Sequence, residues 1–313
     1  MSSDGYPGQS ATETQGWLKA HKWLLLRRAS QIGILGLFLL GPLAGIWIVQ
    51  GNLSASMTLD VLPLTDPMLL LQVIASGTWP VLSGVVGALI VLAFYALIGG
   101  RVFCSWVCPV NLVTDLAVWL RRRLDLRTTS RLSRNLRYWV LGVVLVLPAI
   151  TGVMAWESVN PVSMAHRGLI FAMGWAWAVL LAVFLFDLLV ARHGWCGHLC
   201  PVGAFYGLIG VRAQIRVVAA ERQRCDDCMD CFNICPEPQV IKPALKGADQ
   251  GLGPVILDIN CTNCGRCIDV CSKDVFRFGV RSARVAAPLA RSGAAPGGAG
   301  TQVCPATRAK PNS

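Results

Sequence analysis

The sequence has little charge and few acidic residues. Only 14% of its 313 residues are charged, 17 Asp and Glu stand against 28 Lys and Arg, and 54% of the residues are hydrophobic. This balance excludes an ordinary soluble globular domain and indicates a membrane protein. The basic residues lie between apolar runs and form no single stripe, which disfavours a nucleic-acid partner.

Two further absences each exclude a class of protein. No Cys-x-x-Cys-His occurs, so the sequence offers no site for covalent haem attachment. The first long apolar run is followed by no small-residue cleavage site, so we expect no cleavable signal peptide.

Long apolar runs predict a four-helix membrane domain. A bilayer crossing takes about 20 apolar residues, and four runs reach that length, near residues 30–49, 80–100, 138–156 and 169–191. Residues 101–137 hold eight Lys or Arg, whereas residues 50–79 hold none. Because basic loops stay on the cytoplasmic side, we expect a multi-pass protein of the bacterial inner membrane with both termini in the cytoplasm.

Two short cysteine phrases indicate an internal repeat. Cys104 and Cys108 lie in "FCSWVCPVN", and Cys196 and Cys200 lie before and within "GHLCPVGAF", at the same offset of 92 residues. Each half therefore reads as helix, outer loop, helix, Cys-x-x-x-Cys-Pro. Four thiols near the cytoplasmic face could form redox disulfide pairs, bind a third metal centre, or serve as small buried residues, and the spacing favours redox or metal chemistry. If each pair lies on one helix, both of its thiols share a face, and the proline then turns the chain.

The C-terminal third carries the most specific motif. Two runs have the spacing Cys-x2-Cys-x2-Cys-x3-Cys, which is typical of a ferredoxin with two 4Fe–4S clusters. The fourth cysteine of each run crosses to the other cluster. We therefore assign one cluster to Cys225, Cys228, Cys231 and Cys271, and the other to Cys261, Cys264, Cys267 and Cys235. Tetrathiolate zinc is the alternative, but the doubled regular spacing disfavours it.

Such a module conducts electrons, and a quinol in the membrane is a suitable donor. A quinol site needs proton acceptors, and ionisable groups near the membrane are candidates by default. Five qualify, namely Asp115, Asp187, His198, Glu157 and His166. We favour Glu157 and His166, on the outer side, as the quinol site.

The phrases "HKWLLLRR", "VLPLTDP", "ITGVMAWESVNPVS" and "HGWCGHLCPVGAFYG", together with both ferredoxin runs, resemble the NapH/MauN family of ferredoxin-type membrane proteins. The resemblance covers about residues 17–280 and implies the electron-transfer subunit of a quinol dehydrogenase complex. It implies oxidation of quinol, with ubiquinol expected, and electron delivery to a periplasmic nitrate reductase through a NapG-like iron–sulfur partner. A NapC-like cytochrome is a second candidate partner.

These observations predict an all-α membrane domain of four transmembrane helices, as two tandem two-helix repeats, joined to a small α+β ferredoxin-like domain. The expected divisions are a flexible segment 1–16, a membrane domain 17–215, a ferredoxin-type domain 216–285, and a disordered tail 286–313 that contains Cys304 as a free thiol. Besides electron transfer from quinol, two functions stay open. They are maturation of a redox enzyme, as implied for MauN-like members, and anchoring of a soluble redox complex.

Overall fold

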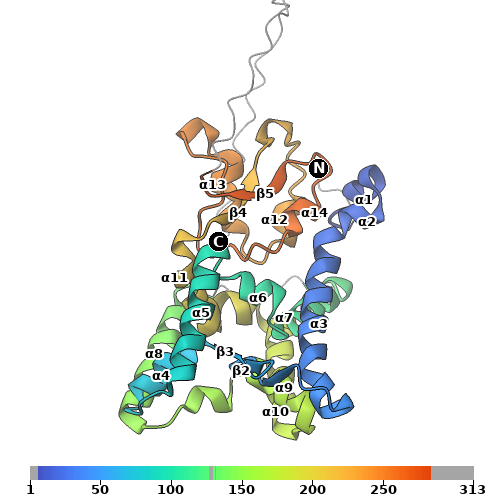
Figure 1. The fold of residues 1–313 in the computed structure, drawn as a ribbon. Coiled ribbons are helices and arrows are strands. Elements are labelled where there is room, and N and C mark those ends of the chain that lie inside the picture. The colour runs from blue at the N-terminus through green and yellow to red at the C-terminus, as the bar shows by residue number, and fades with distance from the viewer. Residues whose placement is uncertain (1–5, 127–129, 131, 283–313) are drawn as a thin grey trace, which may run out of the picture. The chain divides into compact units, whose positions relative to one another are not determined.

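A computed structural model of the chain describes residues 6–126, 130 and 132–282. Its first part is mainly helical, and a small α+β part follows from strand β4 onward (Figure 1). The helices of the first part are α1 (Gln9–Gln15), α2 (Trp17–Ala20), α3 (Lys22–Ala44), α4 (Pro67–Ala75), α5 (Leu82–Ile98), α6 (Val102–Trp106), α7 (Val110–Arg123), α8 (Leu136–Thr151), α9 (Pro161–Phe171), α10 (Gly174–Leu185) and α11 (Pro201–Ile209). The expected tail 286–313, with Cys304, lies outside the described residues.

The N-terminal segment differs from the expected flexible one. Residues 6–16 contain helix α1, and this helix is tied to the ferredoxin part. The backbone N–H of Gly8 donates to Asp230 at 3.0 Å, and the Gln15 amide donates to the carbonyl of Cys271 at 2.9 Å. A polar segment can be ordered when its hydrogen bonds reach distant residues, which composition alone does not reveal.

The expected membrane region also contains a small sheet, so it is not all-helical. Strands β1 (Val49–Gly51), β2 (Ala55–Thr58) and β3 (Leu62–Thr65) form an antiparallel meander. The tight turn between β2 and β3 uses Leu59 and Asp60, both at positive φ. Residues 59–75, which carry two prolines and two aspartates, thus form a strand and a short helix and do not make a full span.

The internal repeat predicted from the cysteine phrases is visible in the helices. In the first half, Asp66 caps α4 and Pro67 opens it; in the second half, Asn160 and Pro161 do the same for α9. Each capping side chain accepts a hydrogen bond from a backbone N–H of its helix, as is usual for N-caps. A longer apolar helix follows, α5 or α10, and then a cysteine phrase and a further helix, α7 or α11.

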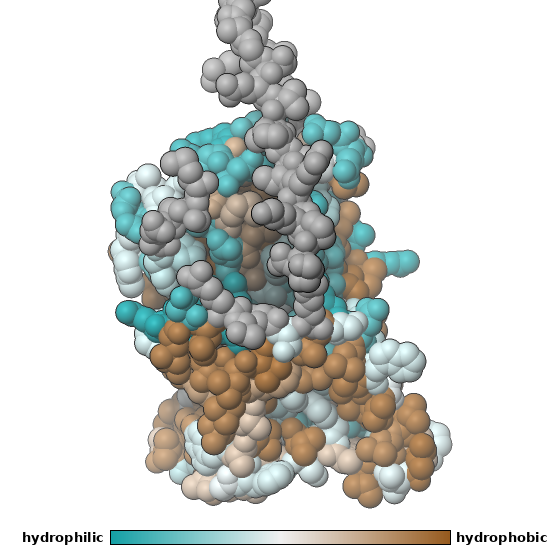
Figure 2. Space-filling model, turned by 180° about the vertical axis from the view of Figure 1, so that it is seen from behind, coloured by the Kyte–Doolittle hydropathy of each residue, from teal (hydrophilic) through white to brown (hydrophobic). Residues whose placement is uncertain are grey.

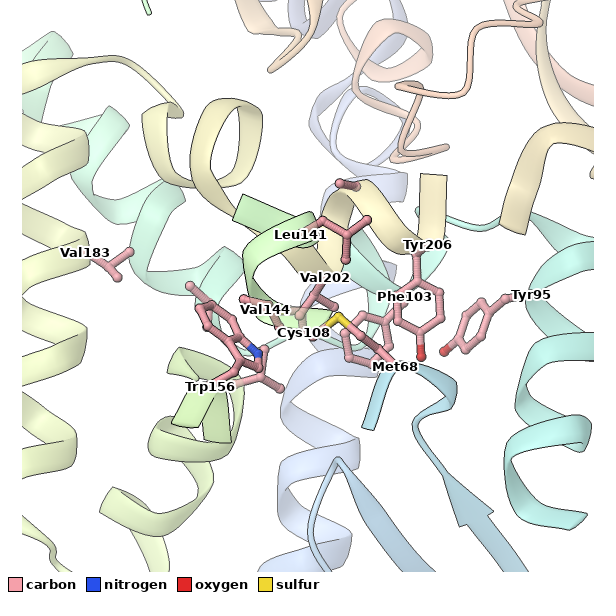
Figure 3. Packing of buried hydrophobic residues seen from close by; sticks show 13 residues of the cluster. Met68, Tyr95, Phe103, Cys108, Leu141, Val144, Trp156, Val183, Val202 and Tyr206 are labelled. Atoms are coloured by element: carbon pink, nitrogen blue, oxygen red, sulfur yellow. The ribbon is translucent and has the colours of Figure 1, made fainter. Parts of the chain in front are cut away.

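The two halves exchange contacts. Helix α7 of the first half packs against α10 of the second, and α11 of the second half packs against α5 of the first. A hydrophobic core forms where they meet, with Phe103, Tyr206 and Tyr95 in ring contact and the sulfur of Cys108 beside them (Figure 3). Both cysteine phrases are thereby brought to the middle of the helical part.

One helix, α3, is long and apolar enough to cross a bilayer. It ends at Gly45, whose left-handed backbone (φ 70°) lets its N–H and that of Ile46 bond to the last turn. Three shorter apolar helices lie at the other predicted spans, namely Leu82–Ile98, Leu136–Thr151 and Gly174–Val190. Their large apolar side chains are exposed, and Figure 2 shows hydrophobic residues gathered over this part of the surface. An apolar surface of this kind is typical of a region covered by lipid or by a partner.

The ferredoxin part is an α+β unit. Strands β4 (Ile215–Ala219) and β5 (Phe276–Val280) pair antiparallel and enclose residues 220–275. The short helices α12 (Asp230–Ile234), α13 (Ile241–Lys246) and α14 (Arg266–Asp269) lie between them. Val217, Ile241, Ile256 and Phe276 form its core together with cysteines of both runs.

A buried ionic cluster joins the ferredoxin part to the helices. Glu237, 2% exposed, accepts hydrogen bonds from Arg101 at 3.1 Å and from Arg137 at 3.0 Å. Arg134 approaches its second oxygen at 3.2 Å. Arg101 and Arg137 also reach the carbonyl and the side chain of Asn260. The guanidinium groups of Arg101 and Arg137 thus bind two loops of the ferredoxin part, one at Glu237 and one at Asn260.

We predict that Glu237→Gln lowers the midpoint of thermal unfolding. Removing one partner of a buried pair leaves the other charges uncompensated, which costs about 3–5 kcal/mol. Burial opposes the charge of Glu237, but Arg101 and Arg137 outweigh it and lower its pKa below the ordinary value. This stabilisation is therefore complete near neutral pH and is lost as the pH falls through the lowered pKa of the folded state.

The exposed Glu221 provides the matched control. Glu221→Gln should leave the midpoint at pH 7 unchanged. Equal midpoints for both variants and the wild type would contradict the role of Glu237.

Candidate iron–sulfur sites

The first assigned ligand set meets around one cavity. Cys225, Cys228, Cys231 and Cys271 all line it, although Cys271 lies 40 residues beyond Cys231 in the chain. Cys231 lies on α12 and Cys271 follows α14. The structure therefore brings the crossing cysteine of the second run to the three closely spaced cysteines of the first run. Four thiols around one cavity fit a 4Fe–4S cluster.

The second set gathers in the same manner. Burial raises the pKa of Cys235, and the neighbouring thiolates of Cys264 and Cys261 raise it further. Burial also raises the pKa of Cys261, to about 11. Cys267 has Cys264, Cys235 and Cys261 as its closest charged neighbours. Thiols in such surroundings keep their protons unless a metal replaces them, so iron binding at these positions would release protons.

Both ligand loops have the same backbone shape. Asp227 and Met229 are left-handed in the first run, and Asn263 and Gly265 are left-handed at the same places in the second. The thiol of the first cysteine in each run donates to the side chain two residues on, at 3.4 and 3.5 Å. Residues other than glycine adopt this conformation rarely. Left-handed residues at the same two places in both runs therefore indicate that the two loops have the same role. Within residues 6–126, 130 and 132–282, no three His, Cys, Asp or Glu side chains are placed to hold a single metal ion.

The four cysteines of the repeated phrases converge. The charged neighbours of Cys196 include Cys200, Cys108 and Cys104. The spacing alone suggested that the two cysteines of each phrase lie on one helix, but in the structure they do not. Cys104 lies on α6 and Cys108 lies beyond its end, while Cys196 lies in a π-helical turn, Trp195–Leu199, before Cys200 caps α11. Pro109 is the N-cap residue of α7 and Pro201 is the first residue of α11, so each phrase ends where a new helix begins.

The two groups of cysteines adjoin each other. A small cavity is lined by Cys104 and Cys196 on one side and by Cys264 and Pro236 on the other. Helix α6 contacts the second ferredoxin loop directly. Ser105 donates to the carbonyl of Thr262 at 2.7 Å, and the Trp106 indole donates to that of Asn263 at 3.1 Å.

Arg101 is a site residue that the sequence reasoning missed. It is 3% exposed and donates to the carbonyl of Cys196 at 3.1 Å. Its charge and hydrogen bond oppose the effect of burial on Cys104, although burial still leaves the pKa of that thiol raised. The sequence did offer one signal for this residue, namely an arginine between an apolar run and a cysteine phrase. Such an arginine can matter because a buried cation beside thiols stabilises their charged form.

The five candidate proton acceptors are scattered. Asp115 accepts hydrogen bonds from Arg28 and Arg266, and Asp187 accepts one from the N–H of Trp195. His198 is half-buried in the turn before α11. On the outer side, Glu157 accepts from Ser163 and Asn160, whereas His166 is 3% exposed and packs edge-on against Phe38. Among the described residues, no hydrogen bond or ion pair joins Glu157 to His166.

A carboxyl–phenol pair also lies near the cysteine phrases. The hydroxyl of Tyr206 donates to Asp66 at 3.1 Å, and the Tyr206 ring stacks on Phe103, next to Cys104. Burial raises the pKa of Asp66 to about 6, against the opposing hydrogen bonds from Met68 and Tyr206, and Glu157 raises it further. The phrase "PLTDP" contained Asp66, but nothing in the sequence showed that Tyr206 would meet it.

Comparison with known proteins gives family matches for both cysteine groups. The family described as "4Fe-4S binding domain" matches residues 80–127 and 173–217, which contain the repeated phrases. The family described as "4Fe-4S dicluster domain" matches residues 224–275.

Curated relatives cover most of the chain. Ferredoxin-type protein NapH of Escherichia coli K12 is 50% identical over 88% of this chain and 95% of its own length. Methylamine utilization ferredoxin-type protein MauN of Paracoccus denitrificans is 54% identical over 80% of this chain and 88% of its own. No solved structure matches.

We predict that Asp66→Asn stabilises the protein more at pH 8 than at pH 5. The folded-state pKa of about 6 exceeds the ordinary value of about 3.9, so the folded protein holds a proton that the unfolded chain releases. Stability is thus lost as the pH rises between these values. Asparagine keeps the N-cap acceptor without the charge. The measurement is the unfolding midpoint of variant and wild type at both pH values.

Asp60→Asn is the control, because Asp60 is exposed in the neighbouring turn. A midpoint difference for Asp66→Asn that is the same at both pH values would show that Asp66 is not held by burial.

Proposed function

The chain belongs to the NapH/MauN family of ferredoxin-type proteins, and on that premise we propose that it is a membrane iron–sulfur protein that oxidises quinol and passes electrons toward a periplasmic nitrate reductase. The observation that carries this proposal is the contact between the two cysteine groups. Cys264 of the ferredoxin part and Cys104 and Cys196 of the helical part line one cavity. Electrons held in one part can therefore reach the other.

The proposed cofactors are two 4Fe–4S clusters and a third centre. Cys225, Cys228, Cys231 and Cys271 hold the first cluster, and Cys261, Cys264, Cys267 and Cys235 hold the second. These clusters supply one-electron redox chemistry when bound. The four thiols of the repeated phrases hold the third centre, a choice supported by their convergence and by the 4Fe-4S family match across both phrases. Redox disulfides among these four thiols are the competing arrangement.

The membrane arrangement we propose has four spans. Helix α3 and the apolar segments Leu82–Ile98, Leu136–Thr151 and Gly174–Val190 cross the bilayer. The basic residues of 101–137 support a cytoplasmic position for the cysteine phrases and the ferredoxin part. Electrons must then cross toward the periplasm. The path from Cys104 past Phe103 and Tyr206 to Asp66 leads toward the opposite, outer loops.

Partners follow from this arrangement. A NapG-like periplasmic iron–sulfur protein is the proposed electron acceptor, and a NapC-like cytochrome is a second candidate acceptor. The quinol pool of the membrane is the proposed electron donor. Maturation of a redox enzyme is the alternative function, because MauN relatives are as similar as NapH relatives. The two differ in one respect. An electron-transfer subunit is needed for turnover, whereas a maturation protein is needed only while its partner is made.

We predict that quinol reduces the clusters of the anaerobically purified protein. Two clusters require about eight irons, and a third 4Fe–4S centre raises this to about twelve. Electron paramagnetic resonance before and after addition of ubiquinol measures the reduction. Failure of quinol to reduce any centre, in a preparation with full iron content, would shift the assignment to maturation.

Cysteine variants separate the centres. Cys228→Ser should remove about four irons and abolish nitrate reduction in cells, and Cys104→Ser should lower the iron content only if the repeated phrases hold a centre. Cys304→Ser is the matched control and should change neither quantity. Normal nitrate reduction with Cys228→Ser would identify the protein as an anchor.

A further inference from the structure

A large cavity lies between the N-terminal helices, α7 and the ferredoxin part. Its volume is about 630 Å³, within the range of small-molecule sites. Most of its lining is apolar, including Leu24, Leu112, Leu116 and Trp119. The phrase "HKWLLLRR", residues 21–28, supplies one wall.

Arg27, one of the residues that line the cavity, has buried hydrogen-bond donors without acceptors. Arg27 is 1% exposed, and among the described residues neither its Nε nor its Nη1 has a hydrogen-bond partner. The neighbouring Arg28 and Arg266 differ, because both bond to Asp115. A buried donor without a partner costs about 1–3 kcal/mol, and more when it is charged. Arg27 therefore lines the cavity while its buried Nε and Nη1 groups lack an acceptor among the described residues.

A proton acceptor lies on the same cavity. The His21 ring is stacked on Trp17, and its Nδ1 lies 2.9 Å from the carbonyl of Trp17. A carbonyl can only accept, so Nδ1 carries the hydrogen of the neutral ring and Nε2 is the atom left to take up a proton. Arg27 and His21 together thus offer a donor and an acceptor to one ligand.

The cavity touches both cluster-binding loops at the crossing cysteines. Ile234 and Val270 line it, and they directly precede Cys235 and Cys271. A ligand in the cavity would lie beside the place where the two ligand sets are interlaced. On the opposite side, Leu116 and Trp119 are 55% and 47% exposed on α7, so the cavity is bordered by apolar surface that an amphipathic molecule could approach from the membrane.

We propose that this cavity binds the headgroup of the quinol, with Arg27 bonding to a quinol oxygen and His21 receiving a proton. The inference rests on the proposed function and locates its substrate site. Both O–H bonds of the quinol break, giving quinone. Two electrons pass singly to the two oxidised clusters, one proton passes to Nε2 of His21, and the other leaves to water at the cavity mouth.

Quinol fits this cavity better than an anionic phospholipid does. A hydroquinone has oxygens that accept from Arg27 and O–H groups that donate to His21. A phosphate group has acceptors only, which leaves Nε2 of His21 unmatched. In this proposal the cavity replaces the outer pair Glu157 and His166 as the favoured substrate site, because no hydrogen bond or ion pair joins those two residues in the part of the chain that the structure describes, whereas the cavity is lined by residues next to Cys235 and Cys271.

The test uses the full-length, cluster-loaded protein under anaerobic conditions. Arg27→Met should slow cluster reduction by subsaturating ubiquinol at least about tenfold, since a hydrogen bond to a charged group is worth that much, and Arg27→Lys should recover part of the rate. His21→Gln should slow reduction by quinol. Reduction by dithionite should be unchanged in all three variants.

Two further experiments distinguish loss of quinol binding from a folding defect. Leu116→Trp, at an exposed cavity position, should slow reduction by quinol, whereas Leu89→Trp, on α5 with 58% exposure, should not. A photoreactive ubiquinone analogue should label residues 20–28 or 112–119 and be displaced by ubiquinol.

The outcomes separate the inference from the function on which it rests. Labelling of residues 157–166, with wild-type rates for Arg27→Met and Leu116→Trp, would overturn the cavity assignment and leave quinol oxidation in place. Loss of a co-purified phospholipid from Arg27→Met, at unchanged quinol rates, would overturn it in favour of a lipid. Labelling of the cavity in a wild-type protein that quinol does not reduce would retain the site and refute the function.

Discussion

The Glu237 carboxylate, enclosed by Arg101, Arg137 and Arg134, is the interaction on which the arrangement of this protein depends. Two buried cations, Arg101 and Arg137, together with the exposed Arg134, leave an excess of positive charge around one carboxylate, which is costly in a low-dielectric interior. The cost is reduced here because the excess faces thiols. Arg101 reaches both the Cys196 carbonyl and the surroundings of Cys104. The same guanidinium group thus contacts both the buried carboxylate and the cysteine phrases.

The repeated halves explain why four thiols meet. Each half alone is a capped short helix, an apolar helix and a cysteine phrase, and neither half can enclose a site. The exchange of α7 and α11 between the halves places the two phrases against each other. Proline at each phrase ends one helix and starts another, so the cysteines lie at a bend where backbone and thiols face inward. Duplication therefore supplies the four thiols of the third centre that we propose.

The proposed route of electrons runs through the joints between these parts. A quinol beside α3 would meet the ferredoxin loops at the crossing cysteines, and the second ferredoxin loop contacts α6 through Ser105 and Trp106. From α6 the contacts continue through Phe103 and Tyr206 to Asp66, near the outer sheet. In this proposal, the quinol on the cytoplasmic side and the electron acceptor on the periplasmic side are connected by these packed side chains. Hydrogen bonds or ring contacts hold each of the side chains in place.

The sequence by itself determined the features that depend on local spacing. The two ferredoxin runs, the repeated phrases and the positions of the apolar helices could all be read from residues a few positions apart, because ligand loops and helix periodicity are set locally. Only the tertiary structure decided which distant groups meet. Arg101 pairs with Glu237 and Tyr206 pairs with Asp66, and the residues of each pair lie more than 80 positions apart in the sequence. The cavity beside Arg27 likewise forms only where distant segments pack together. Long-range partners of this kind are selected by the shape and burial of the folded chain, and no spacing in the sequence records them.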